Sequence, residues 1–292
     1  MQTEDLVVID TPLQDLDMPF LTTVDGELTL IGTDLQLLDL PSLTEVTGSF
    51  KFSENTGNIT QGGSSAPVAI GGQVTIRDNT SLSSLAYFPC LESMPYNLSI
   101  LDNPSLQDLD GLSCLESVGG RVDIIGNTAL QSVAALGQAA GATGLVLRDN
   151  TALTSLEGLE GITTLTDLEV SGHPNLTTSA GLEGLTEVDG DLVWDENGAP
   201  DLSGLSALAT VSGAVSIQGN PGLEDLTGLP GELPGELPEG VLPAKRPGAL
   251  HDPSGRYQTM AMLGRGGMGE VHRVWDRVLE RAVAMKVINK PA

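Results

Sequence analysis

Three glycines and one lysine near the C-terminus have the types and spacing of a phosphate-binding site. Gly264, Gly266 and Gly269 follow the pattern Gly-x-Gly-x-x-Gly, and Lys286 ends the segment Val283-Ala-Met-Lys. Glycines let main-chain N–H groups approach phosphate oxygens closely, and a nearby lysine neutralises the phosphate charge. The alternative is a glycine-rich hairpin that binds nothing. Because two motifs occur together at matching spacing, we favour the phosphate site.

The elements around these residues indicate which kind of phosphate site this is. A dinucleotide-binding glycine loop opens a helix, and a P-loop ends in Lys-Ser/Thr, which this segment lacks. Here the β-prone residues 257–263 precede the glycines, and further strands are predicted at 270–275 and 282–288. A strand, a glycine turn, a strand and then a strand with a lysine is the order in the nucleotide-binding lobe of a protein kinase.

Residues 257–292 resemble the start of bacterial serine/threonine protein kinases. The matching features are the glycine-rich loop, the valine that follows it and the Val-Ala-x-Lys sequence. The resemblance implies a truncated kinase N-lobe β-sheet that binds ATP with Mg, and a protein substrate for the kinase. It also implies the ATP-binding residues, which are Leu263, Gly264, Gly266, Gly267, Gly269, Val271, Ala284 and Lys286.

The same resemblance indicates what this chain should be unable to do. In protein kinases the catalytic base and the metal ligands lie in loops that follow the third strand. The present sequence ends at Ala292, directly after that strand. We therefore expect no catalytic residue and no metal ligand here, no phosphoryl transfer by this chain alone, and a longer kinase of which it is a fragment.

A repeat of 23 or 24 residues fills most of the chain before this segment. In each unit a short apolar strand leads to a marker residue, which is asparagine in all but one case. The marker positions are Asn79, Asn103, Asn127, Asn150, His173, Asn197 and Asn220. Each unit is too small to bury its own apolar side, so stacked units must share one core. The repeat predicts a mainly β solenoid, with Val74 and Ile76 pointing inward and Thr75 outward.

Residues 1–229 resemble leucine-rich repeats, and more specifically receptor L-domain repeats. The pattern is carried by segments such as Leu115-Glu-Ser-Val-Gly-Gly-Arg-Val-Asp-Ile124. The resemblance implies a right-handed parallel β-solenoid whose sheet face recognises a protein. We expect the column of asparagines to bond backbone groups in the turns, as turn asparagines do. A column that holds a metal or a ligand is the alternative.

Outward positions on the predicted strands contain three apolar residues that are candidates for a binding surface. Leu101, Ile125 and Val146 should form a small exposed patch flanked by charged residues. Exposed apolar patches mark partner sites, although single surface apolar residues are common. The patch is therefore a candidate surface for a protein partner on the sheet face.

Two cysteines, Cys90 and Cys114, occupy the same place in adjacent repeats. Stacking would place their Cα atoms about 5 Å apart, which is within the range for a disulfide. Because the sequence shows no export signal, we favour two reduced cysteines in the leucine core of a cytoplasmic protein. The disulfide is the alternative.

Charge divides the chain into two parts. Residues 1–242 carry 35 acidic and four basic side chains, whereas 243–292 carry four acidic and nine basic ones. The net charge of −26 argues against binding nucleic acid and against binding an anionic membrane surface. Prolines within 230–256 predict an extended linker that has no room for a membrane helix.

Together these features predict three parts of different character. Residues 1–229 should be a solenoid recognition domain, 230–256 a linker, and 257–292 the N-terminal fragment of a serine/threonine protein kinase. The alternative is a non-enzymatic protein-binding scaffold with a vestigial kinase-like tail. A third possibility is that the tail docks onto another chain that supplies the rest of the kinase.

Overall fold

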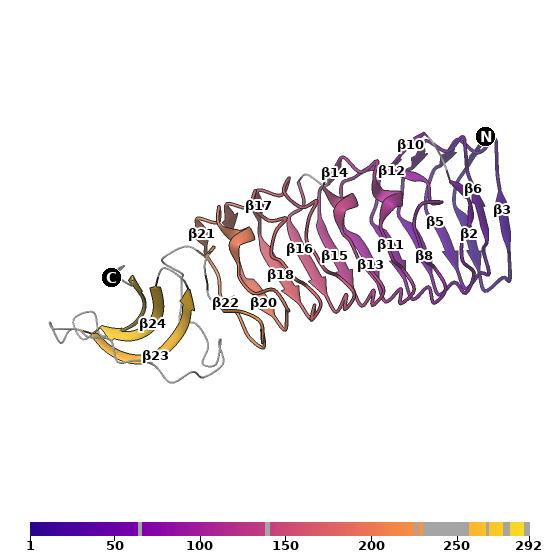
Figure 1. Ribbon diagram of the computed structural model, residues 1–292. Coiled ribbons are helices and arrows are strands. Elements are labelled where there is room, and N and C mark those ends of the chain that lie inside the picture. Colours follow the sequence, from indigo (N-terminus) through magenta and orange to yellow (C-terminus); the bar gives the residue numbers. More distant parts are fainter. Residues whose placement is uncertain are drawn as a thin grey trace.

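The computed structural model describes residues 1–63, 66–137, 141–224, 226, 228–229, 257–266, 269–276 and 281–288. Up to residue 229, short parallel strands stack into an elongated β-solenoid (Figure 1). We call each turn of this solenoid a rung. The predicted mainly β, parallel solenoid is confirmed, and the helices among the described residues are three short 3-10 helices.

The largest sheet takes one strand from each of ten rungs, and all neighbouring strands in it are parallel. Its register pairs equivalent residues of consecutive repeats, for example Ile76 with Ile100 and Ile100 with Ile124. The strands in spatial order are β2 (Leu6–Ile9), β5 (Leu28–Ile31), β8 (Phe50–Ser53), β11 (Val74–Arg77), β13 (Leu98–Leu101), β15 (Arg121–Ile125), β16 (Gly144–Arg148), β18 (Asp167–Ser171), β20 (Leu192–Asp195) and β22 (Val215–Ser216).

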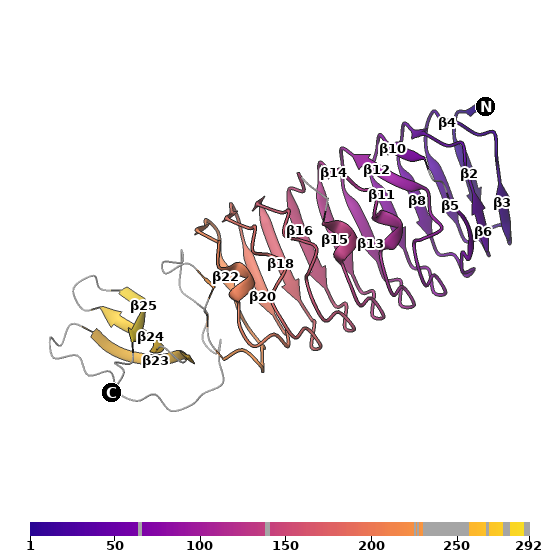
Figure 2. The ribbon, with the colours of Figure 1, turned by 45° about the horizontal axis from the view of Figure 1, so that its top comes forward.

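Smaller parallel sheets and 3-10 helices close the rest of each rung (Figure 2). A six-stranded sheet contains β1 (Gln2–Thr3), β4 (Thr23–Val24), β7 (Glu45–Val46), β10 (Pro67–Ile70), β12 (Cys90–Met94) and β14 (Ser117–Val118). Two three-stranded sheets contain β3 (Asp15–Asp17), β6 (Leu37–Asp39) and β9 (Gln61–Gly63), and β17 (Thr164–Leu165), β19 (Glu187–Val188) and β21 (Thr210–Val211). The helices are η1 (Asp110–Leu112), η2 (Ala134–Leu136) and η3 (Ser203–Leu205).

One continuous apolar core runs along the solenoid. Each main strand points alternate side chains inward, as predicted for Val74 and Ile76, which are both fully buried. The return segments add buried leucines such as Leu106 and Leu109. Each such side chain contributes about 2 kcal/mol when removed from water, and the core forms only because rungs cover one another.

The residue after each main strand except β22 turns the chain in the left-handed conformation. Acidic residues occupy this place in six rungs, namely Asp10, Glu54, Asp78, Asp102, Asp149 and Glu196. Glycine occupies it in others, as at Gly126, where φ is +71°. A Cβ at position 126 would overlap the carboxylate of Asp102 in the preceding rung. A glycine is required there because the backbone φ is positive and because the neighbouring carboxylate leaves no room for a Cβ.

Residues after the solenoid form a separate antiparallel sheet of three strands. They are β23 (Tyr257–Gly266), β24 (Gly269–Asp276) and β25 (Arg281–Ile288), and β24 pairs with both others. The strands predicted on either side of the glycine turn, and the third strand with the lysine, are therefore present.

Candidate functional site

The three tail strands place the backbone of the predicted nucleotide-binding residues in one small region. Gly266 pairs with Gly269 where β23 and β24 meet, and Gly267 between them lies outside the described residues. Gly264 is opposite Val271, and Val271 is in turn opposite Lys286. The glycine turn and the lysine strand are thus joined through β24.

Two further predicted residues lie beside this row. Ala284 on β25 is opposite Arg273, two positions along from Lys286. Leu263 lies on β23 where the register with β24 shifts, between Met262 and Gly264. All the predicted nucleotide-binding residues within the described part of the tail therefore belong to these three strands.

The sheet face of the solenoid brings together two of the three predicted partner-binding residues. Leu101 on β13 and Ile125 on β15 are directly opposite in the register, and both are partly exposed. Val146 was expected beside them as an exposed residue, and this expectation is wrong. Val146 is only 2% exposed, although its position on β16 points outward.

Charged side chains from three neighbouring strands surround Val146. Arg148 donates two hydrogen bonds of 2.6 Å to the carboxylate of Glu169, and Arg121 donates one of 2.5 Å to Asp123. Asp123 and Glu169 are the residues directly opposite Val146 on the two adjacent strands. The sequence pattern gives the direction of a side chain but not whether long neighbours fold over it, so this burial was missed.

The Arg148–Glu169 ion pair shifts the pKa values of both of its members. The hydrogen bond from Arg148 lowers the pKa of Glu169, and partial burial of Glu169 opposes that shift. The hydrogen bond to Glu169 raises the pKa of Arg148. Both groups therefore stay charged at neutral pH, and the charged cluster remains in place over Val146.

The column of marker residues is structural, as predicted. We call it the asparagine ladder, and its members are Asn55, Asn79, Asn103, Asn127, Asn150, His173, Asn197 and Asn220. All are 0% exposed except Asn220, which is 3% exposed. The amides donate to main-chain carbonyls, as Asn103 does to Leu101 at 3.0 Å. They also bond one another, for example Asn79 to Asn103 at 2.8 Å, and this contact was not predicted.

His173 interrupts the asparagine ladder. Its Nδ1 lies 3.2 Å from the carbonyl oxygen of Asn150, and its Nε2 lies 3.1 Å from that of Leu147. A neutral imidazole has one N–H, so it donates to only one of these two carbonyls. Burial lowers the pKa of His173, while the two carbonyls and Asp149 act in the opposite direction.

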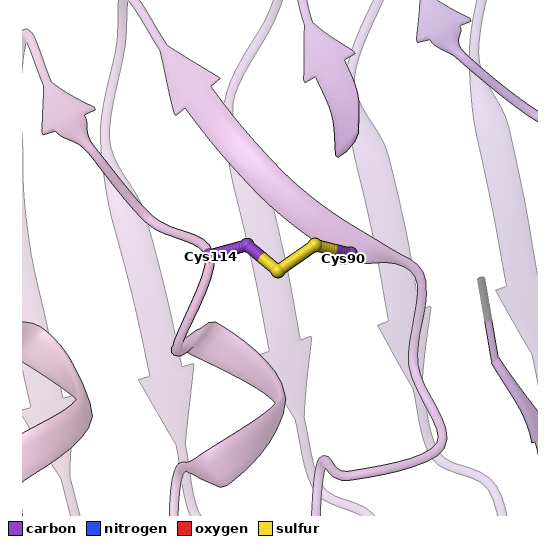
Figure 3. The surroundings of a disulfide bond; sticks show 2 residues. All are labelled: Cys90 and Cys114. Atoms are coloured by element: carbon purple, nitrogen blue, oxygen red, sulfur yellow. A yellow bond between two sulfur atoms is a disulfide. The ribbon is translucent and has the colours of Figure 1, made fainter. Parts of the chain in front are cut away.

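Cys90 and Cys114 form a disulfide, so the favoured prediction of reduced cysteines is wrong. The bond joins the start of β12 to the segment that follows η1 in the next rung (Figure 3). The two Cα atoms are 5.6 Å apart, close to the spacing expected from stacked repeats. Rung spacing thus allows the bond at this pair, and sequence alone could not decide between the two states.

A pocket of about 500 Å³ opens on the side of the solenoid away from the largest sheet. It lies where the six-stranded sheet ends at β14 and the next sheet begins at β17. Thr143, Thr164, Thr166, Glu187 and Asp189 are among the residues that line it. No cluster of three or more His, Cys, Asp or Glu side chains suited to a metal occurs in the described part of the chain.

Within the described ranges, no helix has the length and apolar character needed to cross a membrane. Comparisons of the chain with protein-family models, curated proteins and solved structures gave no match. The candidate sites therefore rest on the residues and geometry described above.

Proposed function

We propose that this chain is the recognition and nucleotide-binding part of a serine/threonine protein kinase. The solenoid would bind a protein partner on its sheet face, and the tail would bind ATP. The observation that carries the proposal is the row Gly264–Val271–Lys286 across the three tail strands. This arrangement supports the proposal because a kinase lysine must reach phosphates that lie under the glycine turn.

The kinase resemblance implies that the ligand of this arrangement is ATP with Mg. The N–H groups of segment 264–269 would contact the phosphates, and Lys286 would neutralise two of them. Leu263, Val271 and Ala284 would enclose the adenine, as the kinase resemblance implies. The bound nucleotide would supply the phosphoryl group that a kinase transfers to its protein substrate.

Calorimetric titration of the purified chain with ATP and Mg²⁺ tests this proposal directly. We expect saturable binding at one site, weakened about tenfold or more by Lys286→Ala, because a charged hydrogen bond to phosphate is lost. Lys290→Ala removes the same charge outside the motif and should leave the affinity unchanged. The proposal would be overturned if the chain did not bind ATP, or if Lys286→Ala and Lys290→Ala lowered the affinity for ATP equally.

The second candidate function is a non-enzymatic scaffold that binds proteins through the solenoid. The observation that favours it is the Cys90–Cys114 disulfide, because stable disulfides are typical of oxidising compartments. A kinase needs ATP, so the first proposal places the protein in the cytoplasm. Alkylation of thiols in acid-quenched cells, followed by mass spectrometry of the cysteine peptides, distinguishes the two. Free thiols favour the cytoplasmic kinase, and a disulfide favours the scaffold.

The proposed partner surface on the sheet is centred on Leu101 and Ile125, which are adjacent and partly exposed. Arg77 and Arg148 lie in the same outward row as these two residues. A partner that places an apolar side chain between two arginines would fit this surface. The strong negative charge of residues 1–242 disfavours nucleic acid and anionic membranes as that partner.

A further inference from the structure

A hydrogen bond between consecutive rungs recurs near the start of the main strand. In several rungs an aspartate or asparagine at this corner accepts the main-chain N–H of the equivalent residue one rung later. We call the accepting side-chain oxygen the corner cap, because it satisfies an N–H that the sheet leaves free. The bonds run from Glu27 to Asp5 (2.7 Å), from Arg121 to Asn97 (3.0 Å), from Asp191 to Asp167 (3.0 Å) and from Ala214 to Asp191 (2.7 Å).

Three consecutive rungs lack the corner cap. Their corner residues are Ser49, Gln73 and Asn97, which directly precede β8, β11 and β13. The main-chain N–H of each has no hydrogen-bond partner in the described part of the chain. The side chains one rung earlier explain this. Glu27 is paired with Lys51 at 2.8 Å, Ser49 is shorter than an aspartate, and Gln73 is longer than an asparagine.

A pocket of about 250 Å³ lies at these uncapped corners. It is lined by Ser49, Gly72, Gln73, Tyr96 and Asn97. The strands that follow these residues, β8, β11 and β13, are neighbours in the largest sheet (Figure 1). The uncapped N–H groups of Gln73 and Asn97 therefore belong to lining residues one rung apart, which is a spacing of about 4.8 Å.

Tyr96 adds an aromatic ring to the pocket. The equivalent residue is glycine in the rungs before and after, at Gly72 and Gly120. A glycine suits a capped corner, since a Cβ at Gly120 would lie only 2.4 Å from Oδ1 of Asn97. A tyrosine fits at position 96 because Gln73 supplies no cap there. With no side chain on either neighbour, the ring of Tyr96 is left 59% exposed.

The pocket offers hydrogen-bond donors and is uncharged. Oδ1 of Asn97 accepts the N–H of Arg121, so the amide of Asn97 keeps two N–H donors that have no partner among the described residues. All five lining residues are uncharged. Residues 1–242 carry 35 acidic and four basic side chains, and this charge repels a free anion. The fitting ligand is therefore neutral and carries several oxygen acceptors.

A pyranose sugar ring meets these conditions. Its hydroxyl oxygens accept N–H donors, and its C–H face packs against an aromatic ring. Alternate equatorial hydroxyls of such a ring stand roughly one rung spacing apart, about 4.8 Å, which matches the N–H groups of Gln73 and Asn97. The pocket is smaller than the about 300–1,000 Å³ typical of drug-sized ligands, so it suits a single ring.

We propose that the pocket beside Tyr96 binds a neutral pyranose sugar ring. The C–H face of the sugar packs against Tyr96, and its hydroxyl oxygens accept the main-chain N–H groups of Gln73 and Asn97. The sugar thus supplies the oxygens that aspartate or asparagine supplies at capped corners. This site is distinct from the sheet-face patch, and it does not depend on the tail binding ATP.

Saturation-transfer NMR of the full chain with methyl glucoside, methyl galactoside and methyl mannoside tests the proposal. We expect transfer to the ring C–H protons of at least one glycoside. Tyr96→Ala should weaken binding about tenfold or more, because it removes the stacking surface. Tyr87→Ala is the matched control, since Tyr87 is also exposed but does not line the pocket. No transfer with any glycoside, or equal losses in the two variants, would overturn the proposal.

Two substitutions at Ser49 test the donors while the aromatic ring stays in place. Ser49→Asp and Ser49→Asn each supply a corner cap for the N–H of Gln73, as Asp5 does for Glu27. Both should weaken sugar binding about tenfold and raise the urea midpoint of unfolding, which also shows that the variants fold. Ser49→Ala supplies no cap and should bind the sugar nearly as the natural chain does. Sugar binding that survives both caps would overturn the proposal.

Two further ligands identify the class and the source of the sugar. Succinate, a dicarboxylate, should not displace the glycoside, and displacement at equal concentration would overturn the proposal because the site would then prefer an anion. A gluco-oligosaccharide that binds more tightly than methyl glucoside would identify a glycan as the source. Equal affinity for the two would identify the free sugar, and both results support a pyranose site.

Discussion

The side-chain oxygen of Asn103 accepts two hydrogen bonds from Asn79, one from its main-chain N–H at 3.1 Å and one from its amide at 2.8 Å. Asn103 repeats this arrangement toward Asn127 of the following rung. Each asparagine therefore satisfies buried polar groups of its own rung and of a neighbouring one. Buried amides that are fully bonded in this way stabilise the turn without leaving unpaired donors.

Asn103→Ala should lower the free energy of unfolding by about 3 kcal/mol, because it leaves buried groups of Asn79 and Ile76 unpaired. Urea unfolding followed by circular dichroism measures the change. Asn175→Ala is the control, since Asn175 is exposed and makes one side-chain bond, to Thr151. The control substitution should lower the free energy of unfolding by about 0.5 kcal/mol or less. Similar losses in both variants would contradict a structural role specific to the ladder.

His173 should make the solenoid less stable in acid. Burial lowers its pKa in the folded protein, whereas the unfolded chain has a pKa near 6.5. Below about pH 6.5 the unfolded state therefore binds more protons, and stability falls as the pH falls. Urea unfolding at pH 7.5 and pH 5 should show this loss in the natural chain.

His173→Asn provides the reference for that comparison. Asparagine restores an amide that can donate to the carbonyl of Leu147, as Asn150 does to Ile124 at 2.8 Å. We expect the variant to lose less stability between the two pH values than the natural chain does. An equal loss would show that His173 does not titrate between folded and unfolded states.

Removal of the disulfide by Cys90→Ala with Cys114→Ala should lower stability by about 3 kcal/mol, because the bond closes a loop with a sequence separation of 24 residues. Thermal unfolding with and without a reductant measures the effect. The reductant should destabilise the natural chain and leave the double variant unchanged. A natural chain that is insensitive to reductant would indicate that the thiols are not joined.

Val146→Thr should cost about 1 kcal/mol, because it buries a hydroxyl beneath the charged cluster of Arg148 and Glu169. Val193→Thr is the matched control, since Val193 lies in the same outward row but is partly exposed. The control should be nearly neutral. Chemical denaturation measures the loss of unfolding free energy in each variant. Equal losses would contradict a difference in burial between Val146 and Val193.

The repeat made most of the solenoid predictable from the sequence. Marker spacing gave the register, so that Leu101 was correctly expected beside Ile125. Alternation also gave the inward direction of Val74 and Ile76. These features follow from local periodicity, which a single sequence contains.

Other features depend on contacts that periodicity does not encode. The burial of Val146 accompanies two charged residues, Asp123 and Glu169, at the paired positions of the adjacent strands. The disulfide depends on the oxidation of two well-placed thiols.

The interruption at His173 has a consequence for how the solenoid comes apart. On one side, bonds between asparagine side chains run without a break from Asn55 to Asn150. On the other side, the backbone of His173 donates to Asn197 and that of Asn197 to Asn220. At this junction the ring of His173 lies against the carbonyl oxygens of Asn150 and Leu147, and β16 pairs with β18 at five residue pairs. An imidazole titrates and an asparagine amide does not, so acid should loosen the stack at this one joint before it affects the joints between asparagines.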